Sequence, residues 1–585
     1  MKYLLLSLFL LLSCAHHKDG QKTAEDIRLD ELFEKHFHQN MKQYPEWATW
    51  KNYKDGIYND RWSDSSLEGI EKGRALAKAQ RIDLIKIDRS KLSEEGKLNY
   101  DLYKERYDHM IEGFKFPGEY FAISQLGGFQ LHLPQLLSRM PARHIRDYNN
   151  LLARFKTMDH VIDQQVALLK MGLKKGITPP KVTLRDVPNQ FLHLFTTDIE
   201  KNPLTKPFRK FPKSLSEAEK KRILKEVKDN LPRLIAKFKE AHSFVKNDYI
   251  PNCRTSIAHS SLPNGKEWYN YEIKGHTTLD LTADEIHAIG LKEVKRIKGE
   301  MAALIKKVKY KGSFKSFLRY LRTNKKFYFT KKEDLLLTYR DIAKRADAKL
   351  LKVFNFLPRT PYGIEPTPAF MEKSAPTAYY NGGNISAGKP GIFLANTYDL
   401  KSRPKWEMVA LTLHEAMPGH HLQISLAQEL EDVPEFRKQG GYTAYVEGWG
   451  LYAESLGEEM EMYEDPYDKF GQLTYEMWRA IRLVVDTGMH AKGWSRQKAI
   501  DFFKGHAPKT EHDVIVEVDR YIIWPGQALS YKLGELKFKE LRKMAKSKLG
   551  EKFDLREYHH QALKNGALPL SILEKKIDSW VEASL

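Results

Sequence analysis

The chain has 585 residues, of which 42% are hydrophobic and 11% aromatic, which argues against a disordered chain. This length is too great for one hydrophobic core, so we expect several lobes or one large multi-lobed unit. The formal net charge is +20, but Lys and Arg are spread along helix-like segments and no nucleic-acid-binding motif occurs, which argues against a nucleic-acid partner. Such a charge favours an anionic envelope surface or acidic substrates, or it is only a solvated basic surface.

The N-terminus predicts export and a lipid anchor. Lys2 precedes an apolar run from 3 to 12, which is typical of a secretory signal peptide and too short to cross a membrane as a mature helix. Leu11-Leu12-Ser13-Cys14 resembles a bacterial lipobox, in which Cys14 is lipidated. We expect a lipoprotein signal peptide over 1–13, a flexible tether over 14–24, and a protein anchored in the bacterial envelope. The outer membrane, facing the periplasm or the cell surface, is the expected place; the alternative is an ordinary cleaved signal with a chance Cys.

The region 25–275 is predicted to be helical. Apolar residues recur at helical spacing over 67–113, with a break near 92–93, and over 142–174. Ser216-Glu-Ala-Glu219 has the form of a capping box and predicts a helix that reaches about Val245. The same pattern at Thr282 and at Thr330 predicts two further helices. Cys253 is the only cysteine besides Cys14, so no disulfide framework is expected.

Three short strands are predicted over 362–366, 377–381 and 391–397, separated by Gly, Ser and Pro. They come just before a histidine-rich stretch. A small sheet beside a metal-binding helix can hold an extended peptide by strand addition, and this favours Tyr379, Tyr380 and Asn381 as substrate-binding residues. The alternative is a purely structural hairpin.

The histidine-rich stretch runs from Trp406 to Gln423 and predicts a zinc site. His414 and Glu415 begin the pattern of an HExxH helix, in which two His four residues apart bind zinc and the Glu is a general base. Here position 418 is Pro, and the next histidines are His420 and His421.

The position of Pro418 predicts a break in this helix. In an unbroken helix a step of six residues turns the side chain about 120° off the first face, and a step of seven carries it about 10 Å along the axis. Proline lacks an N–H and crowds the carbonyl four residues back, which belongs to His414. A bulge at Pro418-Gly419 would return His420 to the second ligand position, so we prefer His420 and keep His421 as the alternative.

A third zinc ligand is expected from Glu447. Catalytic zinc keeps three protein ligands and one open position. Glu447 starts a helical pattern in which Glu454 follows on the same face, where it could orient a ligand His. The alternative is a pair of surface carboxylates on an amphipathic helix.

Four motifs carry a family resemblance: His414-Glu415-Ala-Met-Pro-Gly-His-His-Leu-Gln423, Glu447-Gly-Trp-Gly-Leu-Tyr-Ala-Glu454, Arg479-Ala-Ile-Arg-Leu-Val-Val-Asp-Thr-Gly-Met-His490 and Pro525-Gly-Gln-Ala-Leu-Ser-Tyr531-Lys. They resemble the domain-of-unknown-function 885 family, mostly bacterial envelope lipoproteins, which is regarded as related to gluzincin (thimet-like) zinc metallopeptidases. The ending Gly419-His420-x-Leu-Gln423 is similar to that of thimet-type helices, which supports His420. The spacing of Glu447 and Glu454 is similar to that on the Glu-bearing helix of the same peptidases.

The resemblance also implies donors for the developing oxyanion, because thimet-type enzymes supply a Tyr and a His from the C-terminal lobe. The candidates in the matching part of this chain are Tyr531, His490, Arg482 and Tyr521, the last also as a substrate-binding residue. Each of these residue types is more often used for packing or a structural ion pair.

The expected fold is mainly α: a large multi-helix zincin-like catalytic unit with a deep cleft and a small β-sheet beside the metal-binding helix. The region 276–585 is expected to carry the metal site, and it continues the family domain begun at 25–275. The expected function is a Zn²⁺-dependent metallopeptidase of the cell envelope that hydrolyses peptide substrates, with Glu415 activating water. The alternatives are a catalytically inactive helical lipoprotein that binds or scaffolds, and a zinc hydrolase for a non-peptide bond.

Overall fold

The computed structural model describes residues 22–368, 372, 375–383, 388–438 and 441–585. The predicted signal peptide, Cys14 and most of the predicted tether lie outside the described residues. Helices dominate the described chain, which confirms the predicted mainly α fold. No described helix is long and apolar enough to span a membrane.

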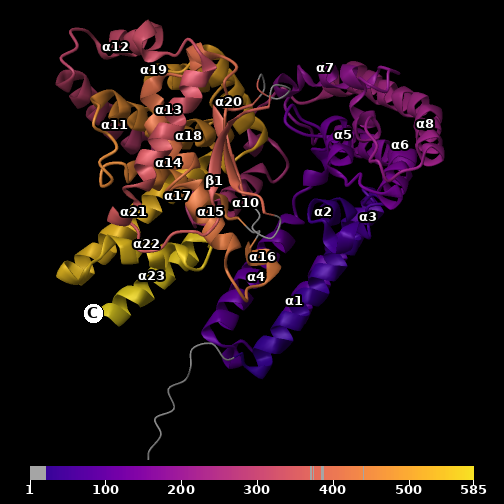
Figure 1. The fold of residues 1–585 in the computed structure, drawn as a ribbon, viewed down its shortest axis with the longest axis horizontal. Helices are drawn as coiled ribbons and strands as arrows, with labels where there is room; N and C mark the ends of the chain where they lie inside the picture. Colours follow the sequence, from indigo (N-terminus) through magenta and orange to yellow (C-terminus); the bar gives the residue numbers. More distant parts are fainter. Residues whose placement is uncertain (1–21, 369–371, 373–374, 384–387, 439–440) are drawn as a thin grey trace, which may run out of the picture.

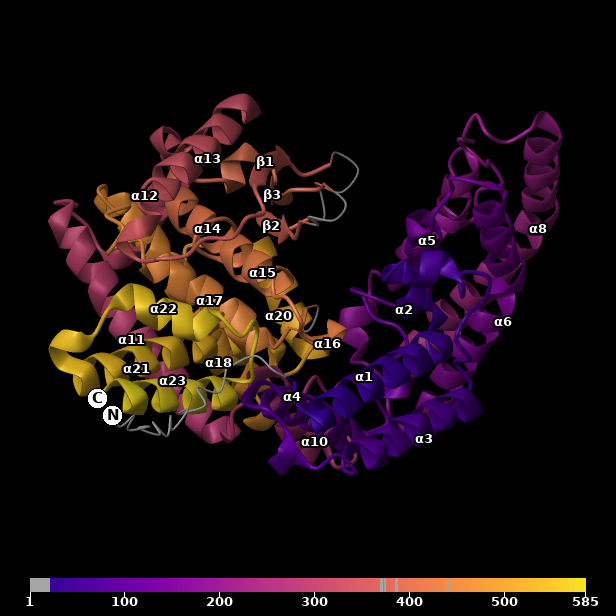
Figure 2. The same ribbon diagram turned by 60° about the horizontal axis from the view of Figure 1, so that its bottom comes forward.

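An N-terminal lobe forms an arm that extends away from the rest of the molecule (Figures 1 and 2). Its long helices α6 and α8 pack side by side around a core of aliphatic and aromatic residues. The helices of this lobe are α1 (Ala24–Gln43), α2 (Pro45–Trp50), α3 (Leu67–Leu84), α4 (Glu94–Gly113), α5 (Phe129–Arg139), α6 (Ile145–Lys175), α7 (Val187–Phe191) and α8 (Glu217–Phe244).

The C-terminal lobe is larger and contains the histidine-rich stretch. Two short helices lead into it, and the predicted boundary between 275 and 276 falls inside the second of them. The elements are α9 (Ile250–Asn252), α10 (Gly265–Thr277), α11 (Ala283–Lys307), α12 (Phe314–Thr323), α13 (Lys332–Asp347), β1 (Tyr362–Pro366), β2 (Ala378–Asn381), β3 (Gly391–Ala395), α14 (Met408–Glu415), α15 (His420–Gln428), α16 (Glu435–Lys438), α17 (Thr443–Ser455), α18 (Pro466–Ala491), α19 (Arg496–His506), α20 (Glu511–Ile523), α21 (Ser530–Leu549), α22 (Leu555–Leu563) and α23 (Leu570–Ser584).

Two of the three predicted capping boxes are present. The hydroxyls of Ser216 and Thr282 accept from the backbone N–H three residues on, and the Glu there bonds back to the cap, so α8 and α11 begin as predicted. The box predicted at Thr330 is wrong. Helix α13 begins at Lys332 with Lys331 as its N-cap, and no side chain caps it.

The three predicted strands form one sheet in the order β1-β3-β2, with β1 parallel and β2 antiparallel to the central β3. Both β1 and β2 are therefore edge strands. Phe393 on β3 is fully buried against Tyr339 of α13, at 5.1 Å between ring centroids. Because β2 also contacts α14, the sheet lies beside the histidine-bearing helix as predicted.

Helix α14 lies in the interior of the C-terminal lobe, and all eight of its residues are buried. It contacts α13, α17 and α18, and α17 in turn packs closely on α21. The last contact needs glycine on both sides: a Cβ on Gly534 would lie 1.9 Å from the carbonyl oxygen of Ala444, and one on Gly448 would lie 2.4 Å from Cα of Gly534. This approach brings the start of α21 next to the helix that carries Glu447.

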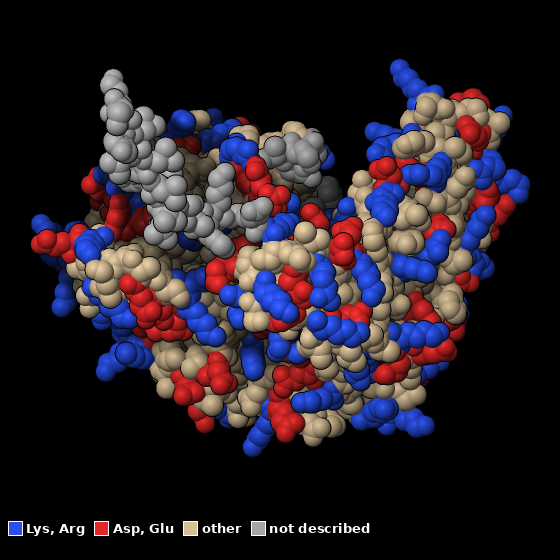
Figure 3. All heavy atoms as spheres, turned by 90° about the horizontal axis from the view of Figure 1, so that it is seen from below, with Lys and Arg blue, Asp and Glu red and all other residues tan. Residues whose placement is uncertain are grey.

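The surface carries both signs of charge. Figure 3 shows Lys and Arg interspersed with Asp and Glu over the face seen from below, on both lobes.

Candidate metal centre

The predicted break in the histidine helix is present. Helix α14 ends at Glu415 and α15 begins at His420, with non-helical ψ angles of −126° at Ala416 and −124° at Gly419. The Met417–Pro418 peptide bond between them is cis. The N–H of His421 donates to the Ala416 carbonyl at 3.2 Å, so the two helices continue across the extruded residues.

Glycine at 419 makes the bulge sterically feasible. A Cβ at this position would lie 2.0 Å from the carbonyl oxygen of His414 and 2.4 Å from that of Leu413. The indole N–H of Trp449 on α17 donates to the Pro418 carbonyl at 2.9 Å, which satisfies a buried acceptor inside the loop. The glycine therefore permits the loop to form, and the helix that carries Glu447 holds it in place.

The break brings His414, His420 and Glu447 together. One potential ligand atom from each lies within 4.8 Å of the others. Nε2 of His414 and Nε2 of His420 are each 3.6 Å from the same carboxylate oxygen of Glu447. Two ligands that each sit about 2 Å from a tetrahedral zinc are separated by about 3.3 Å, so this spacing fits one shared ion.

The environment of these groups suits a metal as well as their spacing does. His414 and His420 are buried, and Nδ1 of His420 is buried with no hydrogen-bond partner in the described chain. Glu447 is 23% exposed, which leaves one side of the cluster open. Two imidazoles and one carboxylate with an open side are the donor set of a catalytic zinc site.

The charges of this cluster are coupled. Burial alone raises the pKa of Glu447, but His414 and His420 beside it outweigh burial and hold the pKa well below its ordinary value. Burial lowers the pKa of His414, but Glu447 and Glu454 raise it to about 9. The carboxylate is therefore ionised, as a metal ligand must be.

Glu454, two turns after Glu447 on α17, orients His414. Its carboxylate lies 2.8 Å from Nδ1 of His414 and 3.7 Å from a guanidinium nitrogen of Arg479 on α18. Glycine at 450 lets the helix pass against the imidazole, since a Cβ there would lie 2.7 Å from the His414 ring. With Nδ1 held by Glu454, the Nε2 lone pair of His414 is directed to the side of Glu447.

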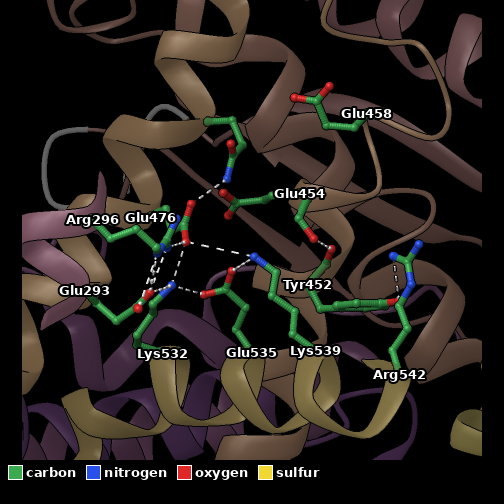
Figure 4. A network of polar contacts seen from close by, with 12 residues as sticks. Glu293, Arg296, Tyr452, Glu454, Glu458, Glu476, Lys532, Glu535, Lys539 and Arg542 are labelled. Carbon is green, nitrogen blue, oxygen red and sulfur yellow. Dashed lines mark hydrogen bonds and ion pairs between the residues drawn. The ribbon is translucent and has the colours of Figure 1, made fainter. Parts of the chain in front are cut away.

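Beneath Glu454, a buried ion network joins α11, α18 and α21 (Figure 4). The ammonium of Lys532 is fully buried and lies 2.6 Å from Glu476, 2.7 Å from Glu535 and 3.1 Å from Glu293. Arg296 also pairs with Glu293 and Glu476. Because Lys532 follows Tyr531, this network fixes the first turn of α21 against the centre.

His421 lies outside the cluster. Its Nδ1 is 2.8 Å from the hydroxyl of Tyr380 on β2 and 3.3 Å from that of Ser425, and its ring packs on Tyr362 at 4.6 Å. Burial lowers the pKa of His421 to about 4. The structure therefore groups His420, and not His421, with His414 and Glu447.

Glu415 is the last residue of α14 and directly follows His414. It is only 8% exposed, yet its carboxylate makes no hydrogen bond or ion pair within the described residues. A nearly buried carboxylate costs free energy unless something solvates it, so this group is available to hold a water or a proton.

Tyr531 and Arg482 lie together, close enough to Glu447 for its charge to act on Tyr531. The guanidinium of Arg482 is stacked 4.3 Å from the Tyr531 ring centroid. Burial, and after it the negative charge of Glu447, raises the pKa of Tyr531, so its hydroxyl stays protonated and can donate. Arg482 is held by the Tyr521 hydroxyl and by Glu517, both at 2.9 Å, and one of its terminal nitrogens is buried without a partner.

The other two predicted donors are engaged elsewhere. His490 is fully buried; its Nδ1 accepts from the N–H of His259 at 3.1 Å and its Nε2 donates to the Tyr521 carbonyl at 2.9 Å. Tyr521 is fully buried, and its hydroxyl bonds to Glu517 and Arg482. Both are thus structural contacts in this arrangement, with no free polar side-chain atom for an oxyanion or a substrate.

Three of the four predicted substrate-binding residues, Tyr379, Tyr380 and Asn381, lie on the edge strand β2. Tyr379 and Tyr380 are half-buried, and Asn381 is exposed. They are in register with Leu394, Phe393 and Ile392 of β3. The Tyr380 hydroxyl is used by His421, while the outer edge of β2 carries no other described strand.

Sequence reasoning missed Arg479, Glu517 and Trp449. Arg479 lies one helical turn before Arg482, so the pair share a face of α18, and this spacing could have pointed to it. Glu517 and Trp449 carry no such signal, because their partners Arg482 and Pro418 are distant in sequence.

The chain is similar in structure to two solved proteins that are described as putative lipoproteins. The structure described as a "putative lipoprotein" from Colwellia psychrerythraea has a TM-score of 0.86 and 28% identity, covering 96% of this chain and 99% of that chain. A "putative lipoprotein of unknown function" from Shewanella oneidensis has a TM-score of 0.70 at 18% identity, covering 93% and 98% of the two chains, and this shows a shared fold. No curated protein matches. The family described as "Bacterial protein of unknown function (DUF885)" matches residues 45–577, and the chain therefore belongs to the DUF885 family.

Proposed function

We propose that this protein is a zinc-dependent metallopeptidase of the bacterial envelope. The observation that carries the proposal is the convergence of His414, His420 and Glu447 on one point, with Glu454 orienting His414. The helix break brings these three residues together. Residues that bind no ligand would not require such a break. The resemblance of the motifs to gluzincin helices supports the same assignment.

Each residue of the centre has a chemical role in this proposal. His414, His420 and Glu447 would hold Zn²⁺, which when bound would supply a Lewis acid for water and for the scissile carbonyl. Glu415, which has no other partner, accepts a proton from the attacking water and passes it to the leaving amine. Tyr531 donates to the developing oxyanion, and the stacked Arg482 positions the Tyr531 ring and stabilises negative charge.

A peptide substrate is favoured by the sheet. The edge of β2 is next to α14 and can pair with an extended peptide by main-chain hydrogen bonds. Tyr379 and Asn381 would then flank the bound peptide, and Tyr380 would stay with His421. A zincin-like catalytic unit with a deep cleft belongs to this proposal.

The place of action follows from the lipobox-like sequence at Cys14. We assign the protein to the envelope as a lipid-anchored, exported protein of the outer membrane. The two structural relatives described as lipoproteins support this assignment.

Metal analysis and one variant test the proposal. The purified protein should bind one equivalent of Zn²⁺ and cleave peptides from a mixed library only when loaded. Glu415→Gln should keep the metal and lose at least about 100-fold in kcat, because the general base is gone. Glu431→Gln, an exposed carboxylate, is the matched control and should keep wild-type turnover.

Two results would reject parts of this assignment. If stoichiometric Zn²⁺ is not bound, the inactive binding or scaffolding lipoprotein is the better description. If Glu415→Gln cleaves peptides at the wild-type rate, Glu415 is not the base.

A further inference from the structure

The segment 306–332 is a uniformly basic surface that the metal centre does not use. It contains eleven Lys and Arg and no Asp or Glu, so it supplies +11 of the chain's net +20. Its cations are Lys306, Lys307, Lys309, Lys311, Lys315, Arg319, Arg322, Lys325, Lys326, Lys331 and Lys332. We call this segment the basic corner.

Every cation of the basic corner is exposed. None of the eleven forms an ion pair with a carboxylate within the described residues, whereas ion pairs are frequent on the N-terminal arm, for example Lys225 with Asp229 at 2.7 Å. Lys326 lies over the rings of Phe327 and Tyr467, at 4.6 and 4.7 Å, and pairs with no acid. The positive charge of this corner is therefore uncompensated.

The arrangement within α12 concentrates the charge on one face. Lys315, Arg319 and Arg322 are spaced by four and three residues, so they line the same outward side of the helix. Like charges at this spacing repel one another and destabilise a helix. A stripe of like charge without acidic neighbours is thus kept at a cost in local stability.

The opposite face of α12 is already occupied. Phe317, Leu318 and Leu321 are buried, and Phe317 packs on Phe470 of α18 at 5.1 Å. The helix has no free apolar face to insert between lipid tails, which membrane-surface helices need. Its partner must therefore be recognised by charge.

The position of the corner also bears on the partner. In both ribbon views α12 lies at the far end of the C-terminal lobe from the start of α1 (Figures 1 and 2). The proposed lipid anchor precedes α1, so the basic corner lies at a different part of the molecule from the residue at which the anchored segment would join it.

We infer that the basic corner binds a linear, water-borne polyanion with closely spaced phosphate or carboxylate groups. Such a polymer can lay successive anions along the stripe of α12 and the cations on either side, releasing bound counterions as it does so. The inference concerns binding alone and is independent of the metal centre. It gives the protein a second attachment, separate from the proposed lipid anchor.

A fluorescein-labelled inorganic polyphosphate tests this inference with the full chain. Its affinity should fall steeply, and linearly on a log–log plot, between about 50 and about 200 mM NaCl. Replacing Lys311, Lys315 and Arg319 together by Gln should weaken binding at least about tenfold at the lower salt and reduce the slope by about three.

The matched control removes the same three charges from α8. Lys220, Arg222 and Lys225 are each paired with an acid on their own helix, so replacing all three by Gln should change the affinity less than about twofold. Circular dichroism and the melting temperature verify that both variants fold.

Three results would overturn the inference. In the first, the wild-type chain does not bind polyphosphate. In the second, the two triple variants lose the same amount of affinity, which would make the effect one of net charge. In the third, phosphatidylglycerol vesicles bind through Lys311, Lys315 and Arg319 and polyphosphate does not, which would make the corner a membrane contact.

Discussion

Nδ1 of His414 lies 2.8 Å from a carboxylate oxygen of Glu454, and this contact determines which ring nitrogen of His414 faces the metal centre. Nε2 is then the nitrogen 3.6 Å from Glu447. Carboxylates that hold the far side of a ligand His fix its tautomer and its orientation and raise its basicity. Arg479 lies behind the same carboxylate, so the chain His414–Glu454–Arg479 runs from the centre into α18.

Glu454→Gln should weaken Zn²⁺ binding by about 10–100-fold, because the amide removes the charge that orients and polarises His414. The affinity is measured by competition with a chromogenic chelator. Glu458→Gln, in the turn after the same helix, is the control. Glu458 is exposed and pairs with Lys469, so the Zn²⁺ affinity of this variant should match that of the wild type. Equal affinities for the two variants would show that Glu454 does not support the ligand.

His420→Asn and His421→Asn should separate the two candidate ligands. His420→Asn should abolish stoichiometric Zn²⁺ binding, because it removes one of three ligands. His421→Asn should retain the metal, since its imidazole bonds to Tyr380 and Ser425, and should instead lower the melting temperature. Metal content by mass spectrometry and thermal melts are the two measurements; loss of metal in His421→Asn alone would reverse the assignment.

Local chemistry explains why the sequence predicts the helix break. In a continuous helix Pro418 would lack the N–H for its hydrogen bond and would crowd the carbonyl of His414, so a disturbance at this point is expected from local chemistry. The capping boxes at Ser216 and Thr282 are local in the same sense. Thr330 has the same pattern but forms no box, because the N-cap of α13 is Lys331 and not Thr330.

The contacts that assign roles to His490 and Tyr521 are not local. A histidine between two backbone groups and one beside a substrate look alike in sequence, and only the fold brings His259 against His490. The same holds for Arg479, whose partner Glu454 lies on another helix. A residue type and its spacing predict where a ligand can be, and long-range packing decides which candidates reach the centre.

Lys532→Met should destabilise the protein strongly. The substitution leaves Glu476 and Glu535, both buried, without their shared ammonium, and breaking such a buried pair costs about 3–5 kcal/mol. The free energy of unfolding is measured by urea denaturation. Lys546→Met, on the exposed side of the same helix, controls for the change in side-chain type and should change that free energy by less than about 0.5 kcal/mol. Equal effects of the two substitutions would show that the network does not fix α21.

Asp486 on α18 should make stability depend on pH. It is fully buried; one oxygen accepts from the Tyr269 hydroxyl at 2.6 Å and from the N–H of Gly526 at 3.1 Å, and the other has no partner within the described residues. Burial raises its pKa to about 7. The folded state thus holds a proton that the unfolded chain, with an ordinary Asp pKa near 4, releases.

The sign of the effect follows from this difference in bound protons. Because the folded state binds more protons than the unfolded state between about pH 4 and pH 7, the contribution of Asp486 to stability is greatest below about pH 4 and falls as the pH rises to 7. Asp486→Asn keeps an acceptor for Tyr269 and Gly526 but cannot ionise. Its melting temperature, relative to that of the wild type, should therefore rise from pH 5 to pH 7 and stay level above about pH 8. A difference in melting temperature that is constant across this range would show that Asp486 does not titrate there.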